Sequence, residues 1–513
     1  IRIGQGIEFD YGCVHAVGAI RDMGHEAIII NNNPETVSTD FDTSDRLYFD
    51  PLTPESVMEI LLRERADGIL LQFGGQTAIN LALPIEAQLS HLENMGVSMQ
   101  MVGTSPDAVD EASDRYRFEE FAKKNNLRMP RGTTATDPIS VRKAAENIGY
   151  PVLIRPSYVL GGRGMEVLTD DKQLEAYMQE AYVAPEKPLL VDEYLGNAIE
   201  LDVDAVCDGQ DVLIGAVMEH LEEAGIHSGD STCFIPTQNV SPEILDQVEE
   251  WTRIIGLELG VIGCFNIQYA IKKDELYVLE VNPRGSRTFP FVAKSTGIPL
   301  ARIAARLTMG DLLSDLNIPE RQEEAVAVKA PVFPFIKLRG LDPAPGPEMK
   351  STGEVMGSHK NAAAAYLKAR MATEIPVPTH GGVYITVKDS DKESIIPLAK
   401  SLKDMEFDLY ATRGTAAILR ERGGLEVNSA YRIAEQGSPD ALDLMRDGKI
   451  QLIINTPTNS GGAVLDGNMM RRLAVELNIP FVTTLSGATM EVQAVAEMIK
   501  GLPEPRSLTI GTV

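Results

Sequence analysis

The chain has 513 residues, of which 44% are hydrophobic and 24% charged, which is typical of a soluble protein with three or four domains. Its formal net charge of −27 argues against nucleic acid or an anionic membrane as the main partner. We find no apolar run long enough for a membrane span, no secretory signal and no CxxC pair among the four cysteines. These features predict a cytoplasmic protein without a zinc site or a disulfide framework.

Residues 1–110 alternate between strand-like and helix-like segments. "EAIIINNN" and "DGILLQFGG" are predicted strands, and "SVMEILLRERA" between them has helical spacing. This order predicts an α/β layer with parallel strands, whose ligands gather at the carboxyl ends of the strands. The opening "IRIGQGIEFDYG" has the character of a loop after a strand, so we expect the first strand to belong to a longer polypeptide.

Residues 111–305 predict an α+β unit built on antiparallel strands. A helix over "DRYRFEEFAKKNN" comes first, and "PVLIRPSYVLGGRGMEVLTD" then predicts two strands around a glycine loop. "CFNIQYAIKKDELYVLEVNP" predicts a hairpin with a charged turn. A connector follows over residues 306–375, with a helix at "RLTMGDLLSDL" and an ordered stretch rich in Pro and Gly. Residues 376–513 alternate strands and helices again and predict a compact α/β domain.

The hairpin carries the first candidate site. Glu280 and Asn282 are two residues apart, so on a strand their side chains face the same way. With a turn at Lys272–Glu275, Gln268 falls opposite residue 279 or 280. Three such oxygen ligands would suit Mg²⁺, which takes carboxylate oxygens together with phosphate and water. The alternative is a solvated strand face.

Two arginines follow directly after the hairpin. Arg284 and Arg287 could neutralise the charge that develops on a transferring phosphoryl group. The alternative is that both form surface ion pairs.

The glycine loop "VLGGRGME" suggests a second contact with phosphates. Gly161, Gly162 and Gly164 allow a close backbone approach, and the loop runs into a strand rather than into the GK[ST] of a Walker A helix. It therefore predicts a flap between two strands, with an ordinary glycine-rich hairpin as the alternative. Arg155 before Pro156 would reach phosphates beneath it, and Glu193 could accept from an adenine amino group or a ribose hydroxyl. Either residue could equally be ordinary surface charge.

The last domain carries a candidate anion site. Thr412 and Thr415 flank Gly414 where a strand runs into a helix, and Asn455 and Thr456 end another strand. Hydroxyls and free N–H groups at a helix N-terminus bind anions, so two such loops could hold one phosphate. Ordinary helix capping is the alternative.

Taken together, the motifs resemble an ATP-grasp enzyme, and more narrowly the carbamoyl phosphate synthetase large subunit. They run in order along essentially the whole chain as "IGQGIEFDY", "NPETVSTDFDTSDRLYF", "GGQT", "GTSPDAVDEASDR", "RPSYVLGGR", "GIHSGDS", "NIQYA", "EVNPRGSRTFPFVAKSTG" and "STGEVMG". The resemblance is to the half that phosphorylates carbamate. It implies a pre-ATP-grasp α/β domain, an ATP-grasp domain, a helical connector and a methylglyoxal-synthase-like allosteric domain.

The resemblance also implies roles for residues that match the family's motifs. Those matched to the nucleotide are Arg115, Arg155, Gly161, Gly162, Glu193, Leu195, Glu200, Gly225, Ile226, His227 and Ser228. Gln268, Glu280 and Asn282 match the metal ligands, and Arg284 and Arg287 match the arginines beside the transferred phosphoryl group. Effector contacts match Thr386, Lys392, Thr412, Thr415, Asn455 and Thr456. Arg432 in "AYRIAEQGSPD" replaces a family lysine with one extra residue, which leaves the effector's identity open.

The activity implied is an ATP-dependent ligase that phosphorylates carbamate to carbamoyl phosphate, which feeds pyrimidine and arginine biosynthesis. Its cofactors would be ATP and Mg²⁺ (or Mn²⁺), with K⁺ as a further candidate. Its partners would be a glutaminase small subunit, the bicarbonate-phosphorylating half and an effector such as UMP or IMP, with a homo-oligomer also open. Three alternatives stay open at this point: the bicarbonate-phosphorylating half, another ATP-grasp carboxylate–amine ligase, and a nucleotide-sensing scaffold without catalysis.

Overall fold

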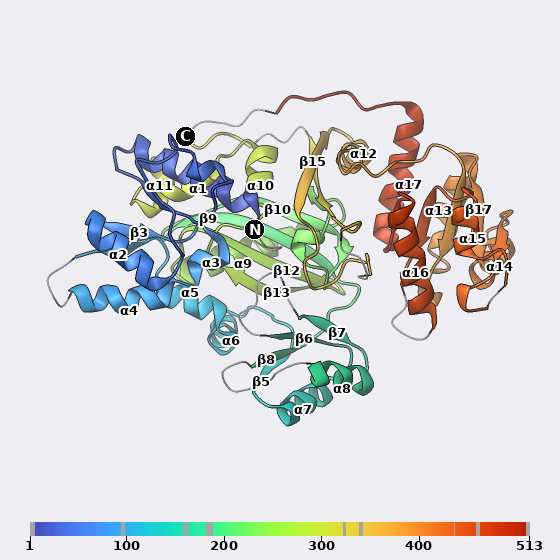
Figure 1. The fold of residues 1–513 in the computed structure, drawn as a ribbon, viewed down its shortest axis with the longest axis horizontal. Helices are drawn as coiled ribbons and strands as arrows, with labels where there is room; N and C mark the ends of the chain where they lie inside the picture. Colours follow the sequence, from blue (N-terminus) through green and yellow to red (C-terminus); the bar gives the residue numbers. More distant parts are fainter. Residues whose placement is uncertain are drawn as a thin grey trace. The chain divides into compact units, whose positions relative to one another are not determined.

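The computed structural model describes residues 6–93, 98–156, 162, 164–180, 188–321, 325–337, 342–435, 437–457 and 462–508. The chain divides into two compact units. Unit 1 holds residues 1–220, 235–323 and 507–513, and unit 2 holds residues 221–234 and 324–506. Figure 1 shows the course of the chain through its helices and strands, and each unit is described by itself below.

Unit 1 begins with an α/β layer. Its elements are α1 (Ile7–Asp22), β1 (Ile28–Ile30), β2 (Arg46–Tyr48), α2 (Pro54–Glu64), β3 (Gly68–Leu70), α3 (Gly75–Ile79), α4 (Ala82–Glu93), β4 (Gln100–Val102) and α5 (Pro106–Ser113). The described strands form two parallel pairs, β1 with β2 and β3 with β4. The predicted parallel pairing is therefore confirmed. Two helix starts follow from their caps, because Thr53 and Ser105 each accept a backbone N–H and are each followed by a proline.

A four-stranded antiparallel sheet follows in the order β5-β8-β6-β7. Its segment comprises α6 (Arg115–Lys124), β5 (Gly132–Ala135), α7 (Pro138–Ile148), β6 (Val152–Pro156), β7 (Glu166–Leu168), α8 (Asp171–Glu180) and β8 (Leu189–Glu193). The predicted flap loop joins β6 to β7, which pair antiparallel from Val152 opposite Leu168. The prediction that this loop lies between two strands is confirmed.

The largest sheet of unit 1 is built on β12. The elements here are β9 (Ile199–Asp208), β10 (Val212–Glu223, whose last three residues belong to unit 2), α9 (Pro242–Glu258), β12 (Ile262–Lys272), β13 (Glu275–Asn282), α10 (Phe289–Thr296) and α11 (Leu300–Thr308). β12 pairs antiparallel with both β9 and β13. Lys273 and Asp274 both have positive φ, which matches the two-residue hairpin turn between β12 and β13.

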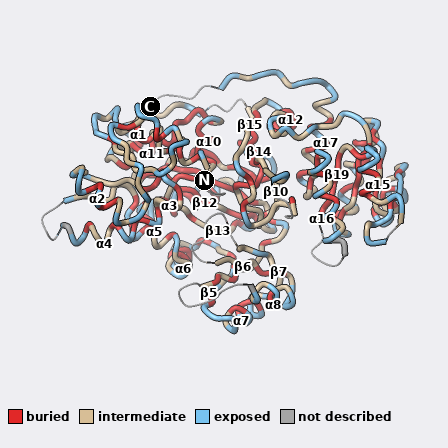
Figure 2. The backbone as a smooth tube through the Cα atoms, in the orientation of Figure 1, coloured by how far each residue is buried: buried red, intermediate tan, exposed pale blue. Residues whose placement is uncertain are grey.

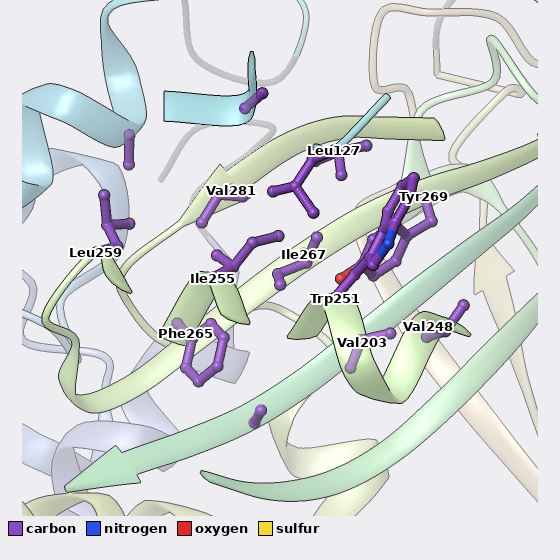
Figure 3. Close-up of a cluster of buried hydrophobic side chains, with 14 of the residues drawn as sticks. Leu127, Val203, Val248, Trp251, Ile255, Leu259, Phe265, Ile267, Tyr269 and Val281 are labelled. Atoms are coloured by element: carbon purple, nitrogen blue, oxygen red, sulfur yellow. The ribbon is translucent and has the colours of Figure 1, made fainter. Parts of the chain in front are cut away.

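The core beneath this sheet fixes the position of the hairpin. Trp251 of α9 lies beside Tyr269 of β12, with ring centroids 6.4 Å apart, and Figure 3 shows both among Ile255, Phe265 and Ile267. The hydroxyl of Tyr269 is 2.9 Å from that of Thr252, so the buried phenol has a hydrogen-bond partner. Figure 2 shows the buried segments running along these strands. One face of β12 is therefore packed, which fixes its register.

Unit 2 contains two short layers. The first holds η2 (Ser228–Asp230), β11 (Cys233–Ile235, whose last residue belongs to unit 1), β14 (Val326–Val332), β15 (Gly353–His359) and α12 (Ala362–Ala372), with β14 and β15 antiparallel. The predicted connector thus contributes two strands as well as helices, because "STGEVMG" and "AVAVKAPV" pair with each other. Two hydrogen bonds also tie α12 to α17 (Leu485–Lys500). Buried Glu491 of α17 accepts from Arg370 at 3.0 Å and from Tyr366 at 2.8 Å.

The C-terminal layer is a parallel five-stranded sheet in the order β18-β17-β16-β19-β20. Its elements are β16 (Gly382–Thr386), α13 (Ile395–Asp404), β17 (Asp408–Thr412), α14 (Arg413–Glu421), β18 (Asn428–Ala430), α15 (Ala441–Arg446), β19 (Leu452–Asn455), α16 (Gly462–Glu476), β20 (Phe481–Val482) and α17 (Leu485–Lys500). The α/β prediction is confirmed, and the short edge strand β18 is an addition to it. No helix among the described residues is both long and apolar enough to cross a bilayer.

Candidate functional site

The hairpin of β12 and β13 places two predicted ligands opposite each other. Gln268 pairs directly with Glu280, and Asn266 pairs with Asn282. The predicted register, with residue 268 opposite 279 or 280, is confirmed. A bulge follows Gln268, so the ladder is locally irregular at the point where these side chains lie.

Hydrogen bonds join Glu280, Asn282 and Arg284 in a row. The Asn282 amide donates from Nδ2 to Oε1 of Glu280 at 3.0 Å, and Arg284 donates from Nη2 to Oδ1 of Asn282 at 3.0 Å. Arg284 also donates from Nε to Oε1 of Gln76 at 3.2 Å, within unit 1. The guanidinium of Arg284 is thus held on two sides, by Gln76 and by Asn282, and these contacts fix its orientation.

A buried glutamine from the first α/β layer holds the turn that carries Arg284. The side chain of Gln72 donates from Nε2 to the carbonyl of Pro283 at 3.1 Å and to Oγ1 of Thr104 at 2.9 Å. The carbonyl of Gln72 accepts from Gly285 N at 2.9 Å. Gln72 lies near the end of the predicted strand "DGILLQFGG", but sequence reasoning did not assign it a role. Its position after β3 was the available signal, because strand ends of α/β layers face ligands.

The two arginines of the turn, Arg284 and Arg287, place two positive charges next to each other. The pKa of Arg284 is lowered to about 10, chiefly by burial and also by the neighbouring charge of Arg287, against the opposing effect of Glu280. The guanidinium of Arg287 lies over the ring of Phe9, 5.9 Å from its centroid. Two neighbouring cations are stabilised by an anion between them, so the pair fits a phosphoryl group.

Asp192 holds two other predicted phosphate arginines. Its Oδ1 lies 3.1 Å from Nη2 of Arg115, and its Oδ2 accepts from Nε of Arg155 at 3.2 Å. Asp114 caps α6 by accepting from Arg117 N at 2.9 Å, which puts Arg115 in the first turn of that helix. A Cβ at Gly132 would lie 1.9 Å from Oδ1 of Asp192, so only glycine leaves room for this pair. Sequence reasoning missed Asp192, although "VDE" placed it beside Glu193.

Arg155 also links two sheets of unit 1, the four-stranded sheet that contains β6 and the largest sheet, which contains β13. Its Nη1 lies 4.0 Å from Oε2 of Glu280, so one arginine of β6 faces a predicted metal ligand of β13. The predicted site residues Arg115, Arg155, Glu280, Asn282 and Arg284 are therefore gathered by direct contacts within one unit.

A buried polar cluster lies behind the arginine turn. Asp204 accepts from Oγ1 of Thr288 at 2.7 Å and from Nδ2 of Asn266 at 2.9 Å. Asn266 also donates to Asp202 at 2.5 Å. The pKa of Asp204 is raised to about 7, chiefly by burial and also by the nearby charge of Asp202. Because Thr288 directly follows Arg287, Asp204 anchors the far side of the turn.

The remaining predicted nucleotide residues of unit 1 occupy three different environments. Glu193 ends β8 and forms an ion pair with Arg131 at 3.0 Å. Leu195 is buried, and Glu200 of β9 is buried with Oε1 3.6 Å from Nδ1 of His220. Gly162 has a φ of +68°, which favours glycine, whereas Gly161 and most of the flap lie outside the described residues.

The loop with Gly225, Ile226, His227 and Ser228 belongs to unit 2 and is ordered by its own contacts. Nδ1 of His227 accepts from Gly229 N at 3.0 Å, and His227 N donates to the carbonyl of Gly346 at 2.9 Å. Gly225 has a φ of +99°. The histidine therefore has a clear role in shaping the loop.

The predicted effector residues lie at one edge of the C-terminal sheet. Thr386 and Asn455 are register partners at the carboxyl ends of β16 and β19, and Asn455 donates from Nδ2 to the carbonyl of Thr386 at 3.3 Å. Thr456 accepts at Oγ1 from Lys388 N at 2.9 Å. Lys388 was not predicted. Such an edge, with hydroxyls and amides at successive strand ends, is the usual ligand side of a parallel sheet.

The other effector residues lie around the start of α14 and on the segment before α15. Thr412 donates from Oγ1 to Oγ1 of Thr415 at 3.3 Å, and Thr415 is buried. Lys392 pairs with Asp389 at 2.6 Å. Arg432 lies 3.5 Å from Oδ2 of Asp466 on α16.

The hairpin presents a small set of oxygen ligands. Among the described residues, no three His, Cys, Asp or Glu side chains gather in a metal-binding cluster. Glu280 with the amide oxygens of Gln268 and Asn282 is instead one carboxylate and two neutral oxygens. This set fits Mg²⁺, which is usually held by one or two carboxylates together with substrate phosphates.

Three family models match the chain in succession. Residues 1–111 match the carbamoyl phosphate synthase preATP-grasp domain, and residues 114–316 match the carbamoyl-phosphate synthase L chain ATP binding domain. Residues 394–483 match the MGS-like domain.

Relatives named carbamoyl phosphate synthase large chain align over nearly the whole chain. The carbamoyl phosphate synthase large chain of Methanothermobacter thermautotrophicus is 51% identical over 99% of this chain and 47% of its own length. The "carbamoyl phosphate synthase large chain, C-terminal section" of Methanocaldococcus jannaschii is 49% identical over 98% of this chain and 82% of its own length. The chain belongs to the carbamoyl phosphate synthase large chain family. It spans about half the length of the first relatives it matches, which run beyond it.

Solved structures support the fold of the chain. The biotin carboxylase domain of 2-oxoglutarate carboxylase from Hydrogenobacter thermophilus, in complex with MgADP, ADP and bicarbonate, has a TM-score of 0.55. It shares 17% identity over 71% of this chain and 87% of its own. N5-carboxyaminoimidazole ribonucleotide synthetase from Thermotoga maritima has a TM-score of 0.51, with 16% identity over 71% of this chain and 95% of its own.

Proposed function

We propose that this chain transfers the γ-phosphoryl group of ATP to carbamate and releases ADP and carbamoyl phosphate. It would act as the carbamate-phosphorylating half of a carbamoyl phosphate synthase large chain. One observation carries the proposal: Glu280 is register partner to Gln268 and hydrogen-bonded to Asn282, which is in turn bonded to Arg284. This arrangement occurs in a chain that is 49% identical to a relative named as the C-terminal section of a carbamoyl phosphate synthase large chain.

The nucleotide would bind with its phosphates between the four-stranded sheet and the largest sheet of unit 1. Arg115 and Arg155, both held by Asp192, would supply fixed positive charge, and Gly161 and Gly162 would let the flap approach the phosphates. Glu193, Leu195 and Glu200 would contact the adenosine. The loop with Gly225, Ile226, His227 and Ser228 would line the nucleotide.

Gln268, Glu280 and Asn282 would hold Mg²⁺ or Mn²⁺, which would neutralise charge on the β- and γ-phosphates. K⁺ remains a further candidate ion. In the transfer step, a carbamate oxygen forms the new bond to the γ-phosphorus while the bond to the β–γ bridging oxygen breaks. Arg284 and Arg287 would stabilise the charge on the transferring group, because the guanidinium of Arg284 is already oriented by Gln76 and the charge of Arg287 lies beside it.

The C-terminal domain would bind the phosphate of a nucleotide effector such as UMP or IMP. Its ligand groups would be Thr386, Lys392, Thr412, Thr415, Arg432, Asn455 and Thr456. Support comes from the gathering of Thr386, Asn455 and Thr456 at the carboxyl edge of a parallel sheet. Lys388 joins this set through its contact with Thr456.

The wider assembly is part of the same proposal. Carbamate would come from a bicarbonate-phosphorylating half, and ammonia from a glutaminase small subunit, in a cytoplasmic enzyme serving pyrimidine and arginine biosynthesis. Domain borders near residues 110, 305 and 375 would separate the pre-ATP-grasp domain, the ATP-grasp domain, the connector and the effector domain.

The experiment that tests this proposal is the partial back-reaction. The chain alone is mixed with MgADP and carbamoyl phosphate, and ATP formation is followed with a luciferase assay. We expect ATP to form, since this step needs neither glutamine nor the other half. ATP hydrolysis that depends on bicarbonate, without ATP formation from carbamoyl phosphate, would contradict the proposal and favour the bicarbonate-phosphorylating half.

A further inference from the structure

The first α/β layer brings one amide side chain to the arginine turn. Gln76 of α3 accepts at Oε1 from Nε of Arg284, 3.2 Å away, while Asn282 accepts at Oδ1 from Nη2 of the same arginine. Arg284 therefore lies between a residue of the first layer and a predicted metal ligand of β13. Because an arginine side chain only donates, the oxygen of the Gln76 amide faces the guanidinium and its nitrogen faces away from it.

The nitrogen of this amide keeps one donor for a ligand. Nε2 of Gln76 donates to Oδ1 of Asn80 at 2.9 Å, and an amide nitrogen carries two N–H groups. Among the residues that the structure describes, the second N–H has no hydrogen-bond partner. Gln76 is only partly buried, so a small molecule can reach this donor.

A close packing contact fixes the backbone just before Gln76. Gly75 has a φ of +65°, and a Cβ at this position would lie 3.1 Å from the ring of Phe9. The same ring lies against the guanidinium of Arg287, 5.9 Å from its centroid. Phe9 thus contacts both the residue before Gln76 and the second arginine of the turn, so all of these groups belong to one neighbourhood of unit 1.

The geometry of phosphoryl transfer determines where the acceptor must lie. The attacking and leaving oxygens are in line, on opposite sides of the γ-phosphorus. In the proposed function the nucleotide phosphates and Mg²⁺ bind on the side of Glu280 and Asn282, so ADP leaves on that side. The acceptor must then approach from the other side of Arg284, which is the side on which Gln76 lies.

From these contacts we propose that Gln76 binds the acceptor substrate by donating a hydrogen bond to its carboxylate group. This inference rests on the proposed function, because that function supplies the acceptor, carbamate. One carbamate oxygen forms the bond to the γ-phosphorus while the bond to the bridging oxygen breaks, and ADP leaves with the electron pair. The other carbamate oxygen accepts from Nε2 of Gln76. No proton has to be removed, because carbamate is already an anion.

The two ends of the Gln76 amide thus have different roles. Oε1 orients Arg284, and Nε2 holds the acceptor next to that arginine. A glutamate at this position would keep the first role and lose the second, because a carboxylate accepts hydrogen bonds but does not donate them. Its negative charge would also repel the acceptor.

The first test measures ATP formation from MgADP and carbamoyl phosphate in the parent, Gln76→Glu and Gln76→Met. We expect kcat/KM for carbamoyl phosphate to fall at least about 10-fold in both variants, with the KM for MgADP within about 2-fold of the parent in Gln76→Glu. Gln100→Glu, at an exposed glutamine of β4 in the same layer, is the matched control and should match the parent. A parent-like Gln76→Glu beside an impaired Gln76→Met would overturn the proposal, because Gln76 would then only orient Arg284.

A second measurement separates contact with the acceptor from a change at Arg284. The binding of carbamoyl phosphate and of inorganic phosphate is measured by calorimetry with Mg²⁺ but without ADP, so no turnover is required. Gln76→Glu should weaken the binding of carbamoyl phosphate at least about 5-fold and that of inorganic phosphate less than about 2-fold, because only carbamoyl phosphate has a carbamoyl end. Equal weakening of both ligands would overturn the proposal, because the effect would then lie at the arginines that hold the phosphate.

The proposed function and the role of Gln76 fail in different ways. A parent that binds carbamoyl phosphate but forms no ATP would count against the proposed function, while the binding measurement would still decide the role of Gln76. A parent that forms ATP beside a Gln76→Glu variant with the parent's kcat/KM would overturn the role of Gln76 alone. A folded parent that does not bind carbamoyl phosphate would overturn both.

Discussion

Gln268 and Glu280 are direct register partners on neighbouring antiparallel strands. The register brings an amide oxygen and a carboxylate together from residues twelve apart in the sequence, with Asn282 hydrogen-bonded to the same carboxylate. The packed face of β12, with Tyr269 and Ile267 in the core, prevents a one-residue slip that would turn Gln268 away. The relative positions of the predicted metal ligands Gln268, Glu280 and Asn282 thus depend on the packing of the core beneath β12.

Replacing Arg284 by lysine should impair the chemical step more than nucleotide binding. A lysine cannot keep the contacts to Gln76 and Asn282 at the same time, so the charge would no longer be fixed in place. We expect the rate of ATP formation to fall about 100-fold or more, with MgADP affinity changed less than about 3-fold. Arg253→Lys, at an exposed pair with Asp211, is the control. Equal losses in rate and affinity would show that Arg284 serves binding rather than transfer.

Asp192→Asn should release Arg115 and Arg155 together. Both guanidiniums lose a buried charged partner, so we expect the KM for MgADP to rise about 10-fold and the free energy of unfolding to fall by about 2 kcal/mol. Steady-state kinetics and urea unfolding measure the two effects. Glu175→Gln, at an exposed pair with Arg142, should change neither. A parent-like KM in a folded Asp192→Asn variant would contradict the role given to Asp192.

Asp204 should make stability depend on pH in a defined direction. Its folded-state pKa of about 7 lies above the ordinary value of about 4 for an aspartate, so between these values the folded chain holds a proton that the unfolded chain has released. This contribution to stability is complete below about pH 4 and is lost as the pH rises through about 7. Urea unfolding at pH 5 and pH 8 should therefore show a smaller loss of stability with rising pH in Asp204→Asn than in the parent. Identical pH dependence in both proteins would refute the assignment.

Thr456→Ala should separate effector binding from catalysis. Its hydroxyl accepts from Lys388 N at the carboxyl edge of the C-terminal sheet, so its loss would disorder the loop that is proposed to bind phosphate. We expect calorimetry to show at least about 10-fold weaker binding of whichever of UMP or IMP binds the parent, while ATP formation without effector stays unchanged. Thr489→Ala on α17 is a comparable threonine change away from this edge. Unaltered effector binding would place the effector elsewhere.

The sequence was sufficient to predict the local elements and the pairing that forms the site. The hairpin register followed from the turn at Lys272–Glu275, and the parallel C-terminal sheet followed from alternating strands and helices. These features are local, so periodicity and turn chemistry determine them.

Long-range contacts could not be predicted in the same way. Gln72 holds Pro283 across 211 positions, and Arg471 pairs with Asp342 across 129. Asp192 lies beside the predicted Glu193, yet its two arginine partners come from α6 and β6. Neither spacing nor composition contains these pairings, because they arise only when separate layers pack together. The strands of the connector were missed for the same reason, since β14 and β15 depend on each other.

The measurement that tests the central claim most directly compares ATP formation from MgADP and carbamoyl phosphate in the parent, Glu280→Gln and Glu275→Gln. Glu280 and Glu275 lie on the same strand, but only Glu280 is placed with Gln268 and Asn282. The account predicts that the parent and Glu275→Gln form ATP at similar rates, and that Glu280→Gln loses at least about 100-fold at saturating Mg²⁺. Comparable rates in all three proteins, or no ATP from a folded parent that binds MgADP, would contradict it.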